Sequence, residues 1–532
     1  MRGPNVSYIR ATYRKRRSAA IVASVIAAVL LLGSLGAPAA TAVSAISARS
    51  KPSPSVSLAL SKSTIGLGRE VTVSGRVRVS GHNVSKAKVT VLGKAAAATT
   101  WKTLGKVKTK SNGKFSLTFK PSVGYSVRVK VAATKKSAAH TSAIKRLAVA
   151  PVLSSVSPSG FSRAVLTRSK FFTGKASSAL AKRRVALNVL EGTIWKRVAE
   201  TRFDDSGRFS FEIGSAAVGQ RSYRIYVPAD GGLTSLTSGT RVVETVKNSA
   251  VLRDTESCYG AAAFVKKGCT NSRLDGLMLP TTDSADLKIE TGGAYLSNCW
   301  SRLPYELVKT CRYGSSSSDA PRIALVGDSH AAGYVPALRD QITRRGWQMD
   351  TFLGITCRWM ELADDDPCQA RSVDLDQRLR DGDYDLIVYT GVRELSGKVP
   401  DDVAESNAAE IAASYSGVWG PMLETGVAIV AIEDFGFARD LSCVTEAVGQ
   451  EAAGCVDTPE SMFRGIDPIP LAVEQTPGAR MIDLTSMFCS SKSCPLVQGN
   501  VVVYRDAHHL TGMYAETLGP YLADKIAKEL DR

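Results

Sequence analysis

Cysteine is absent from the first 257 residues of this 532-residue chain, and acidic residues are scarce in the same region. Residues 1–250 contain 42 Lys and Arg but only 8 Asp and Glu, whereas residues 251–532 contain 26 and 41. The front half is therefore strongly cationic and the back half anionic. Because a field of one sign concentrates partners of the other, we expect the front half to seek polyanions. Without disulfides, any domain there must be held by its apolar core.

The chain also lacks CxxC spacing with interleaved histidines, which excludes the usual cysteine-based zinc sites. Its ten cysteines are even in number and fall in close couples in the back half. This pattern predicts local disulfides in an oxidising compartment. We expect no metal and no cofactor. The simplest pairing is Cys258–Cys269, Cys299–Cys311, Cys357–Cys368, Cys443–Cys455 and Cys489–Cys494.

The N-terminal segment of residues 1–50 contains a long apolar run, SAAIVASVIAAVLLLGSLG, after the basic stretch MRGPNVSYIRATYRKRR. The small residues of APAATAVSA fit cleavage after Ala42 or Ala45, which predicts a signal peptide. Alternatively, the uncut run anchors the protein, with the basic cluster kept inside the cell. Either way the protein is expected outside the cytoplasm, secreted or anchored. Envelope polymers are then better partners than nucleic acid.

Two similar stretches, residues 51–150 and 151–248, follow a Ser/Pro-rich linker. Trp101 and Gly113 recur as Trp195 and Gly207 with an offset of 94 residues. Short alternating strands and turn residues predict one immunoglobulin-like β-sandwich per copy. The tryptophans either pack on the strands or form a sugar-stacking platform. The repeats themselves either bind an anionic polymer or act as a spacer, and both roles are compatible.

Residues 249–532 have a different pattern of apolar residues. The apolar runs RIALVGD, WQMDTFLG, YDLIVYTG, VAIVAIEDFG and ARMIDLTS have strand length, and helix-length segments separate several of them. Near-continuous apolar strands that alternate with helices predict a parallel sheet covered on both faces. The fold class is therefore multidomain: two all-β sandwiches followed by a three-layer α/β/α, flavodoxin-like domain.

Two strand-end segments of this domain carry the chemistry. Ser329 lies in GDSHAAG, directly after the run PRIALV, and the second segment is VVVYRDAHHLT. A serine needs a base within hydrogen-bond reach and a third group that orients the base. Asp506 and His509 are three residues apart, so the carboxylate can hold the imidazole while its other nitrogen faces Ser329. We predict that Ser329 is the nucleophile, His509 the base and Asp506 its orienting group.

Three of the five histidines in the chain lie in these two segments. His330 either takes part in the chemistry or only begins a helix, and His508 is either functional or an exposed neighbour of His509. Asp328 has an ordinary role as a turn and N-cap residue.

GDSH and DxxH at the two ends of an α/β domain resemble the SGNH (GDSL-like) hydrolase superfamily. The likeness is closest to the extracytoplasmic SGNH domain fused to membrane glycan O-acyltransferases, and it covers nearly all of residues 250–532. It implies that the Ser329 N–H contributes to an oxyanion hole. Gly354 in FLGITC is either the second-block glycine or a turn residue. GVRE stands where GxND is expected, so Arg393 either replaces the asparagine donor or pairs with Glu394 or another acid.

The resemblance implies a serine acyl enzyme that cleaves or transfers O-acyl esters, such as acetyl esters, on cell-envelope glycans. Hydrolysis is slightly favoured, since two basic repeats stand where the fused relatives carry their membrane domain; transfer would need a separate membrane acyltransferase. The alternative is a non-catalytic scaffold that binds an envelope polysaccharide or other anionic surface polymer.

Overall fold

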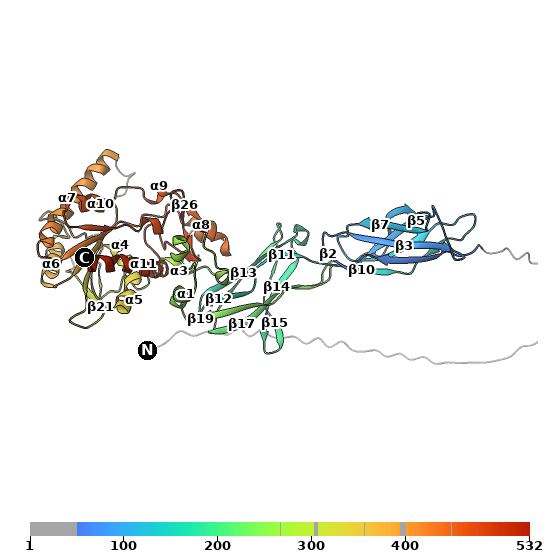
Figure 1. Cartoon of the computed structure of the whole chain (residues 1–532), viewed down its shortest axis with the longest axis horizontal. Coiled ribbons are helices and arrows are strands. Elements are labelled where there is room, and N and C mark those ends of the chain that lie inside the picture. Colours follow the sequence, from blue (N-terminus) through green and yellow to red (C-terminus); the bar gives the residue numbers. More distant parts are fainter. Residues whose placement is uncertain (1–50, 267, 303–306, 356, 394–400, 448) are drawn as a thin grey trace, which may run out of the picture. The chain divides into compact units, whose positions relative to one another are not determined.

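The computed structural model describes residues 51–266, 268–302, 307–355, 357–393, 401–447 and 449–532. The N-terminal segment interpreted as a signal peptide or anchor lies outside these ranges. Within them, no helix has both the length and the apolar character needed to cross a membrane. The part that follows the linker is all-β, and the part that ends the chain mixes strands with helices (Figure 1).

Residues 55–150 form two sheets that face one another across a shared core. The core takes Val73 and Phe115 from one sheet and Val89 and Val129 from the other. The first sheet contains β1 (Ser55–Leu60), β3 (Val71–Val79), β4 (His82–Asn83) and β7 (Lys114–Phe119). The second contains β2 (Thr64–Gly66), β5 (Lys88–Ala95), β6 (Lys102–Lys108), β8 (Tyr125–Val131), β9 (His140–Thr141) and β10 (Lys145–Ala150).

Residues 153–246 repeat this arrangement. One sheet contains β11 (Leu153–Ser157), β13 (Ser169–Ala176) and β16 (Arg208–Gly214). The other contains β12 (Phe161–Val165), β14 (Arg184–Glu191), β15 (Ile194–Arg202), β17 (Gly219–Val227), β18 (Leu236–Thr237) and β19 (Arg241–Val246). The short 3-10 helix η1 (Ser178–Leu180) leads into β14. The observed strands support two multi-stranded β units, and their immunoglobulin-like identity stays a prediction.

The two copies share local detail that follows from their sequence similarity. The β5–β6 pairing shifts register between Val91 and Leu92, and β14–β15 shifts at the equivalent place. Gly113 and Gly207 both adopt positive φ at the following turn. Each tryptophan carries a guanidinium over its ring, with Arg128 4.0 Å from the Trp101 centroid and Arg224 4.2 Å from that of Trp195. Because a cation covers the ring, strand-surface packing is favoured over sugar stacking.

The sheet of the C-terminal part is parallel along its main path. Its order is β20 (Trp300–Ser301), β23 (Gln348–Gly354), β22 (Arg322–Gly327), β24 (Leu386–Thr390), β25 (Ala428–Ile432) and β27 (Arg480–Ile482). β21 (Thr310–Gly314) adds to β23 in the antiparallel sense. The five apolar runs named above supply β22 to β25 and β27, as the sequence predicts.

Helices cover both faces of this sheet (Figure 1). Alternate residues of β22 point to opposite sides: Leu325 packs in a core with α5 (Val335–Arg345) and α11 (Gly512–Leu530). Val326 packs in a second core with α6 (Gln369–Asp381), α7 (Asp401–Leu423) and α10 (Pro468–Gln475). This alternation follows from the two-residue period of a strand buried on both faces.

Shorter elements complete the C-terminal part. Before the sheet come α1 (Ser249–Thr255), α2 (Ala262–Val265), η2 (Ser272–Leu274) and α3 (Ser284–Lys288). After β22 and β25 come α4 (Ser329–Gly333), α8 (Ser442–Thr445), η3 (Gly449–Gly454), α9 (Pro459–Met462) and η4 (Thr485–Met487). Two-stranded ladders join β26 (Val456–Asp457) to β28 (Cys494–Pro495), and β29 (Val497–Gln498) to β30 (Val501–Val502).

The segment VVVYRDAHHLT was expected to be a strand that ends in polar residues, and it supplies only the short strand β30. This strand forms a tight hairpin with β29 outside the main sheet, and Val501 also makes an isolated parallel bridge to Leu279. Gly499 and Asn500 at the turn both have positive φ, which closes the hairpin and directs the following residues back along the domain. Asp506 and His509 therefore lie on a loop between β30 and α11 rather than at a strand end.

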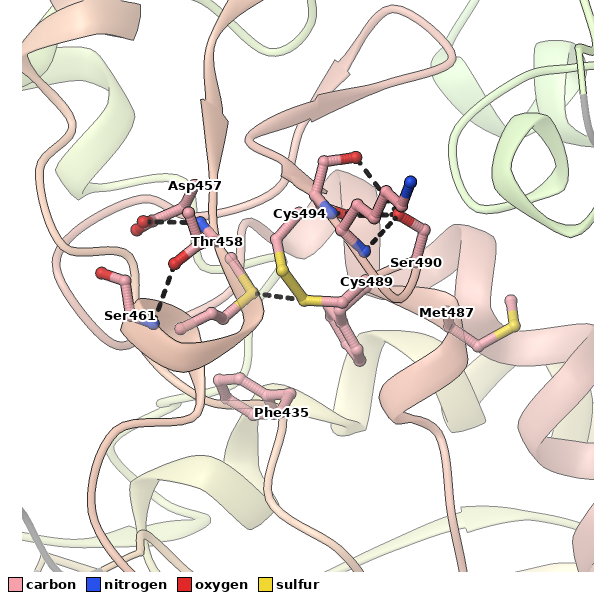
Figure 2. Close-up of a disulfide and its surroundings, with 12 residues drawn as sticks. Phe435, Asp457, Thr458, Ser461, Met487, Cys489, Ser490 and Cys494 are labelled. Atoms are coloured by element: carbon pink, nitrogen blue, oxygen red, sulfur yellow. Dashed lines mark hydrogen bonds between the residues drawn. A yellow bond between two sulfur atoms is a disulfide. The ribbon is translucent and has the colours of Figure 1, made fainter.

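All five predicted disulfides are present. Figure 2 shows the Cys489–Cys494 bond. The Met462 sulfur lies 3.4 Å from the Cys489 sulfur. Phe488, directly before this loop, packs on Phe435 with ring centroids 6.0 Å apart. The disulfide therefore constrains a loop next to Phe488, and Phe488 contacts Phe435 of the candidate site described below.

Reduction of the disulfides should lower the stability of the C-terminal part and leave that of the β units unchanged. Closing loops of this length contributes about 2–3 kcal/mol per disulfide in the chain-entropy description. We expect dithiothreitol to lower the calorimetric melting transition of the C-terminal part, and to leave that of the cysteine-free β units within error. Equal shifts of all transitions would contradict this assignment of stability.

Candidate active site

Ser329 lies where β22 ends and α4 begins. The preceding Gly327 has φ +146°, and a Cβ on it would lie 1.9 Å from the carbonyl oxygen of Thr390 on β24. Any other residue would push the two strands apart, so glycine is required for this close approach. As the first residue of a helix, Ser329 has an N–H that no intrahelical carbonyl accepts. Its side chain is half-buried at the carboxyl edge of the sheet.

Asp328 has the structural role that the sequence suggests, and a further one. It caps α4: its Oδ1 accepts a hydrogen bond from the His330 N–H at 2.8 Å. Its Oδ2 accepts from the Val392 N–H, also at 2.8 Å. Asp328 thus ties the GDSH segment to the GVRE segment after the neighbouring strand β24.

Asp506 and His509 are paired on the loop before α11. The His509 Nδ1–H donates to both carboxylate oxygens of Asp506, at 3.0 and 2.9 Å, and Oδ1 also accepts from the N–H groups of His508 and His509. Burial opposes the charge on Asp506, but these bonds and the nearby Arg505 outweigh it and hold its pKa well below the ordinary value. Asp506 is therefore ionised and fixes the His509 ring with its proton on Nδ1.

The remaining ring nitrogen of His509 is the informative one. His509 Nε2 is buried, and it has no hydrogen-bond partner among the residues that the structure describes. With the proton on Nδ1, the neutral ring keeps a lone pair on Nε2. An unsatisfied buried acceptor is costly in a protein, so this nitrogen is kept available for a proton that arrives from elsewhere.

Tyr295 brings Ser329 and His509 to one place. Its hydroxyl donates to the backbone oxygen of Ser329 at 2.9 Å, and its ring packs edge-on against the His509 ring at 6.1 Å. Burial raises the pKa of Tyr295 to about 12, so the hydroxyl stays protonated and can donate. Within the described ranges, no hydrogen bond joins the Ser329 hydroxyl directly to His509.

His330 is more than the first turn of a helix. It is fully buried; its Nδ1–H donates to Asp434 Oδ1 at 2.6 Å, and Phe435 stacks on its ring with centroids 4.5 Å apart. Burial opposes protonation of His330, but the negative charge of Asp434 outweighs it and raises the pKa. His508 is half-buried, not an exposed neighbour, and its Nδ1 lies 3.3 Å from His330 Nε2 in a hydrogen bond.

Asp434 is the residue that the sequence analysis missed. It follows β25, and the two acids that end the run VAIVAIEDFG were the available signal. Its Oδ2 accepts from both the N–H and the Nε–H of Arg393, at 3.1 and 3.3 Å. Burial opposes its charge, yet His330 and Arg393 outweigh this and hold the pKa of Asp434 below its ordinary value. The buried acid therefore connects the GDSH and GVRE segments through charge.

Two expectations about the oxyanion hole have different outcomes in the geometry. Gly354 ends β23 beside β22, at the edge that carries Ser329. The Arg393 guanidinium, in contrast, is buried and donates to Asp434 and to the carbonyl oxygen of Phe463, with Asp467 3.8 Å away. These contacts favour its alternative role as an acid partner over that of oxyanion donor. Glu394 lies outside the described residues.

Comparisons with known proteins give one family and several distant structures. The sequence profile of a family described as "SGNH domain (fused to AT3 domains)" matches residues 298–524. No curated protein matches the chain. Among solved structures, the "D0-D1 domain of Intimin" is 12% identical; the match covers 36% of this chain and 98% of that one, with a TM-score of 0.15.

Two further structures are equally remote. A tetra-tandem repeat in the extending region of a large adhesion protein is 14% identical over 36% of this chain and 50% of its own, with a TM-score of 0.22. A Salmonella alpha-2-macroglobulin mutant is 10% identical over 38% and 17%, with a TM-score of 0.17. Scores this low support no argument about structure or function.

Proposed function

Because residues 298–524 form an SGNH domain of the kind fused to AT3 domains, we propose that this protein is a serine acyl enzyme acting on O-acyl esters of cell-envelope glycans. Ser329 is the nucleophile, His509 the general base and Asp506 the group that orients it. The five disulfides and the family of the domain support a location outside the cytoplasm.

One observation carries the proposal. His509 is held by Asp506 through Nδ1, its Nε2 is buried with no hydrogen-bond partner among the described residues, and its ring packs against Tyr295, whose hydroxyl bonds the Ser329 backbone oxygen. In a serine acyl enzyme this nitrogen takes the proton of the serine hydroxyl as the oxygen attacks the ester carbonyl. It then returns the proton to the leaving alcohol, and a second alcohol or water releases the acyl group.

The developing oxyanion needs donors that are already oriented. The Ser329 N–H, free of intrahelical partners, is the first such donor. Gly354 at the end of β23 is the second, through its backbone N–H, because it lies at the same edge of the sheet. Arg393 supports the site indirectly, because its hydrogen bonds to Asp434 hold that acid and the GVRE segment in place.

Hydrolysis fits this site better than transfer. Ser329, Asp506 and His509 are all half-buried rather than enclosed, so water reaches the acyl-enzyme. Transfer to a glycan hydroxyl uses the same three residues and would need a separate membrane acyltransferase as acyl donor. Mass spectrometry of surface glycans from cells with and without the protein separates the two: acetyl esters that accumulate on loss indicate an esterase, and acetyl esters that disappear indicate a transferase.

The chemistry itself is tested with the purified full-length protein and p-nitrophenyl acetate. We expect p-nitrophenol release and, after acid quenching, an acetylated peptide that contains Ser329. If neither the release nor the adduct exceeds that of heat-denatured protein, the enzyme is excluded. A non-catalytic scaffold that binds envelope polymer then becomes the better description.

A cavity in the first β unit favours a second, compatible activity, the binding of an anionic polymer. It has a volume of about 1020 Å³ and lies along β1, β3 and β7, far in sequence from Ser329. Its lining includes the four cations Arg76, Arg78, Lys110 and Lys114, with small serine side chains between them. Positive charge gathered in a hollow attracts a polyanion more strongly than the same charge spread over a convex surface.

Neutralising these cations should weaken retention on a polyanion such as heparin. We expect the variant with Arg76, Arg78, Lys110 and Lys114 all changed to Gln to elute at clearly lower salt than the wild type, whose own retention falls by about 0.5 M salt as screening shortens to a few ångströms. The matched control changes four exposed lysines outside the cavity, Lys130, Lys135, Lys136 and Lys145. Equal losses in both variants would point to net charge, not to the cavity.

A further inference from the structure

We propose that His330, His508 and His509 form a three-histidine site for a borderline divalent cation such as Zn²⁺, and that the bound ion blocks the serine chemistry. One ring nitrogen from each histidine lies within 4.8 Å of the others. In the part of the chain that the structure describes, this is the one group of metal-ligating side chains that meets such a distance. A metal was not expected from the sequence, because these histidines come from segments 178 residues apart.

One pair of ring nitrogens already has the spacing that a tetrahedral metal requires. Zinc binds imidazole nitrogen at about 2.0–2.1 Å, so two ligands in a tetrahedron lie about 3.4 Å apart. His330 Nε2 and His508 Nδ1 are 3.3 Å apart. His509 Nε2 is buried and has no hydrogen-bond partner among the described residues, and a ring nitrogen of His509 lies within 4.8 Å of the other two. Three histidines leave one position for water.

The two carboxylates of the site hold two of the histidine rings in place. A metal-bound histidine usually donates its other N–H to a carboxylate, which fixes the ring and makes it a better ligand. Asp434 holds His330 through Nδ1 at 2.6 Å, and Asp506 holds His509 through Nδ1 at 2.9 Å. Each ring thereby keeps Nε2 as the nitrogen that does not contact a carboxylate and that would ligate the ion. The hydrogen bond between His330 and His508 is lost when the ion takes the place of the proton they share.

The ion and the serine compete for one nitrogen. His509 Nε2 cannot both ligate a metal and accept the Ser329 proton, so an occupied site is inactive in ester cleavage and a chelator restores it. This inhibition rests on the proposed function, whereas binding of the ion does not. Zinc at the envelope would therefore switch the enzyme off reversibly.

Binding is tested directly with Co²⁺, because four-coordinate Co²⁺ absorbs visible light far more strongly than the hydrated ion. Full-length protein without a histidine tag is titrated with CoCl₂, and Zn²⁺ is then added to displace it. We expect one ion per chain and an intense visible band that Zn²⁺ abolishes. A wild type that gives no such band and takes up no Zn²⁺ in equilibrium dialysis overturns the proposal.

Variants locate the site. His508→Gln removes a ligand that the serine mechanism does not use, and Asp506→Asn removes the carboxylate that holds the His509 ring; each should weaken Co²⁺ binding by about 10-fold to 100-fold. The control, His82→Gln with His140→Gln, removes the two histidines outside the cluster and should bind as the wild type does. Thermal melts establish that each variant is folded, and if His508→Gln is not, His509→Gln is used in its place. Unchanged affinity in a folded ligand variant contradicts the site.

Activity is recorded separately, as the ratio of p-nitrophenyl acetate hydrolysis with and without Zn²⁺ for each variant. Inhibition in the wild type and loss of inhibition in His508→Gln support the switch. Binding without any hydrolysis, in the presence of chelator, sinks the proposed function but leaves the metal site standing. Hydrolysis without metal binding contradicts the metal site and leaves the proposed function standing.

Discussion

Replacing Ser329 with Ala is expected to lower kcat for p-nitrophenyl acetate by about 10⁴-fold or more, since loss of a triad nucleophile removes the covalent route. The side chain is half-buried at the end of β22 and packs no core, so the fold should persist. Tyr295 bonds the backbone oxygen of residue 329, and this contact survives the substitution. Steady-state kinetics on the purified full-length protein measure the effect.

The control is Ser318→Ala, because Ser318 is exposed on the loop before β22 and should retain full activity. Residual hydrolysis in Ser329→Ala above that of buffer would come from the oxyanion donors alone. Activity within threefold of the wild type would assign the reaction to another nucleophile. The acetylated peptide should disappear in parallel with turnover.

Replacing Asp434 with Asn should produce the largest loss of stability. Both carboxylate oxygens accept hydrogen bonds, from His330 on one side and from Arg393 on the other. An amide of the same shape must turn an NH₂ group towards one of these donors, and it removes the negative charge that balances the buried guanidinium. Breaking a buried ion pair by removal of one partner costs about 3–5 kcal/mol. We expect a loss of this size in the free energy of unfolding of the C-terminal part.

Differential scanning calorimetry of the full chain reads this change, with the cysteine-free β units as internal reference transitions. Asp365→Asn is the control, because Asp365 is an exposed acid on a loop. A melting transition of Asp434→Asn that coincides with that of Asp365→Asn would show that the His330–Asp434–Arg393 cluster contributes little to stability. Activity should also fall, because His330 follows Ser329 directly and its ring would lose its anchor.

Most of the fold could be predicted from the sequence wherever residues close together in the chain determine the structure. A run such as YDLIVYTG contains four consecutive apolar residues, LIVY, which is typical of a strand buried on both faces. Cysteines eleven or twelve residues apart, and the couple Cys489–Cys494, can reach each other without help from distant chain, so their pairing followed from proximity. The hairpin at residues 497–502 was not predicted, because a short apolar run such as VVVY looks the same whether it forms a longer strand or turns back after two residues.

Only part of the candidate site could be predicted from the sequence. Asp506 and His509 are three residues apart, and one turn of loop suffices to join them. Arg393 could not be assigned from its neighbours in the chain, because its partner Asp434 lies 41 residues away, just after the neighbouring strand β25. The same holds for Tyr295, whose hydroxyl contacts Ser329 and whose ring contacts His509 on the loop before α11.

The sequence by itself determined which groups are available: a serine after a buried strand, a histidine with an acid three residues before it, and a cationic front half. The tertiary structure alone decided which of them meet. Side chains at the carboxyl ends of β22, β24 and β25 become neighbours only because these strands lie next to one another in a parallel sheet. That order places Asp434 against His330 across 104 residues, and nothing in the local spacing of either segment contains it.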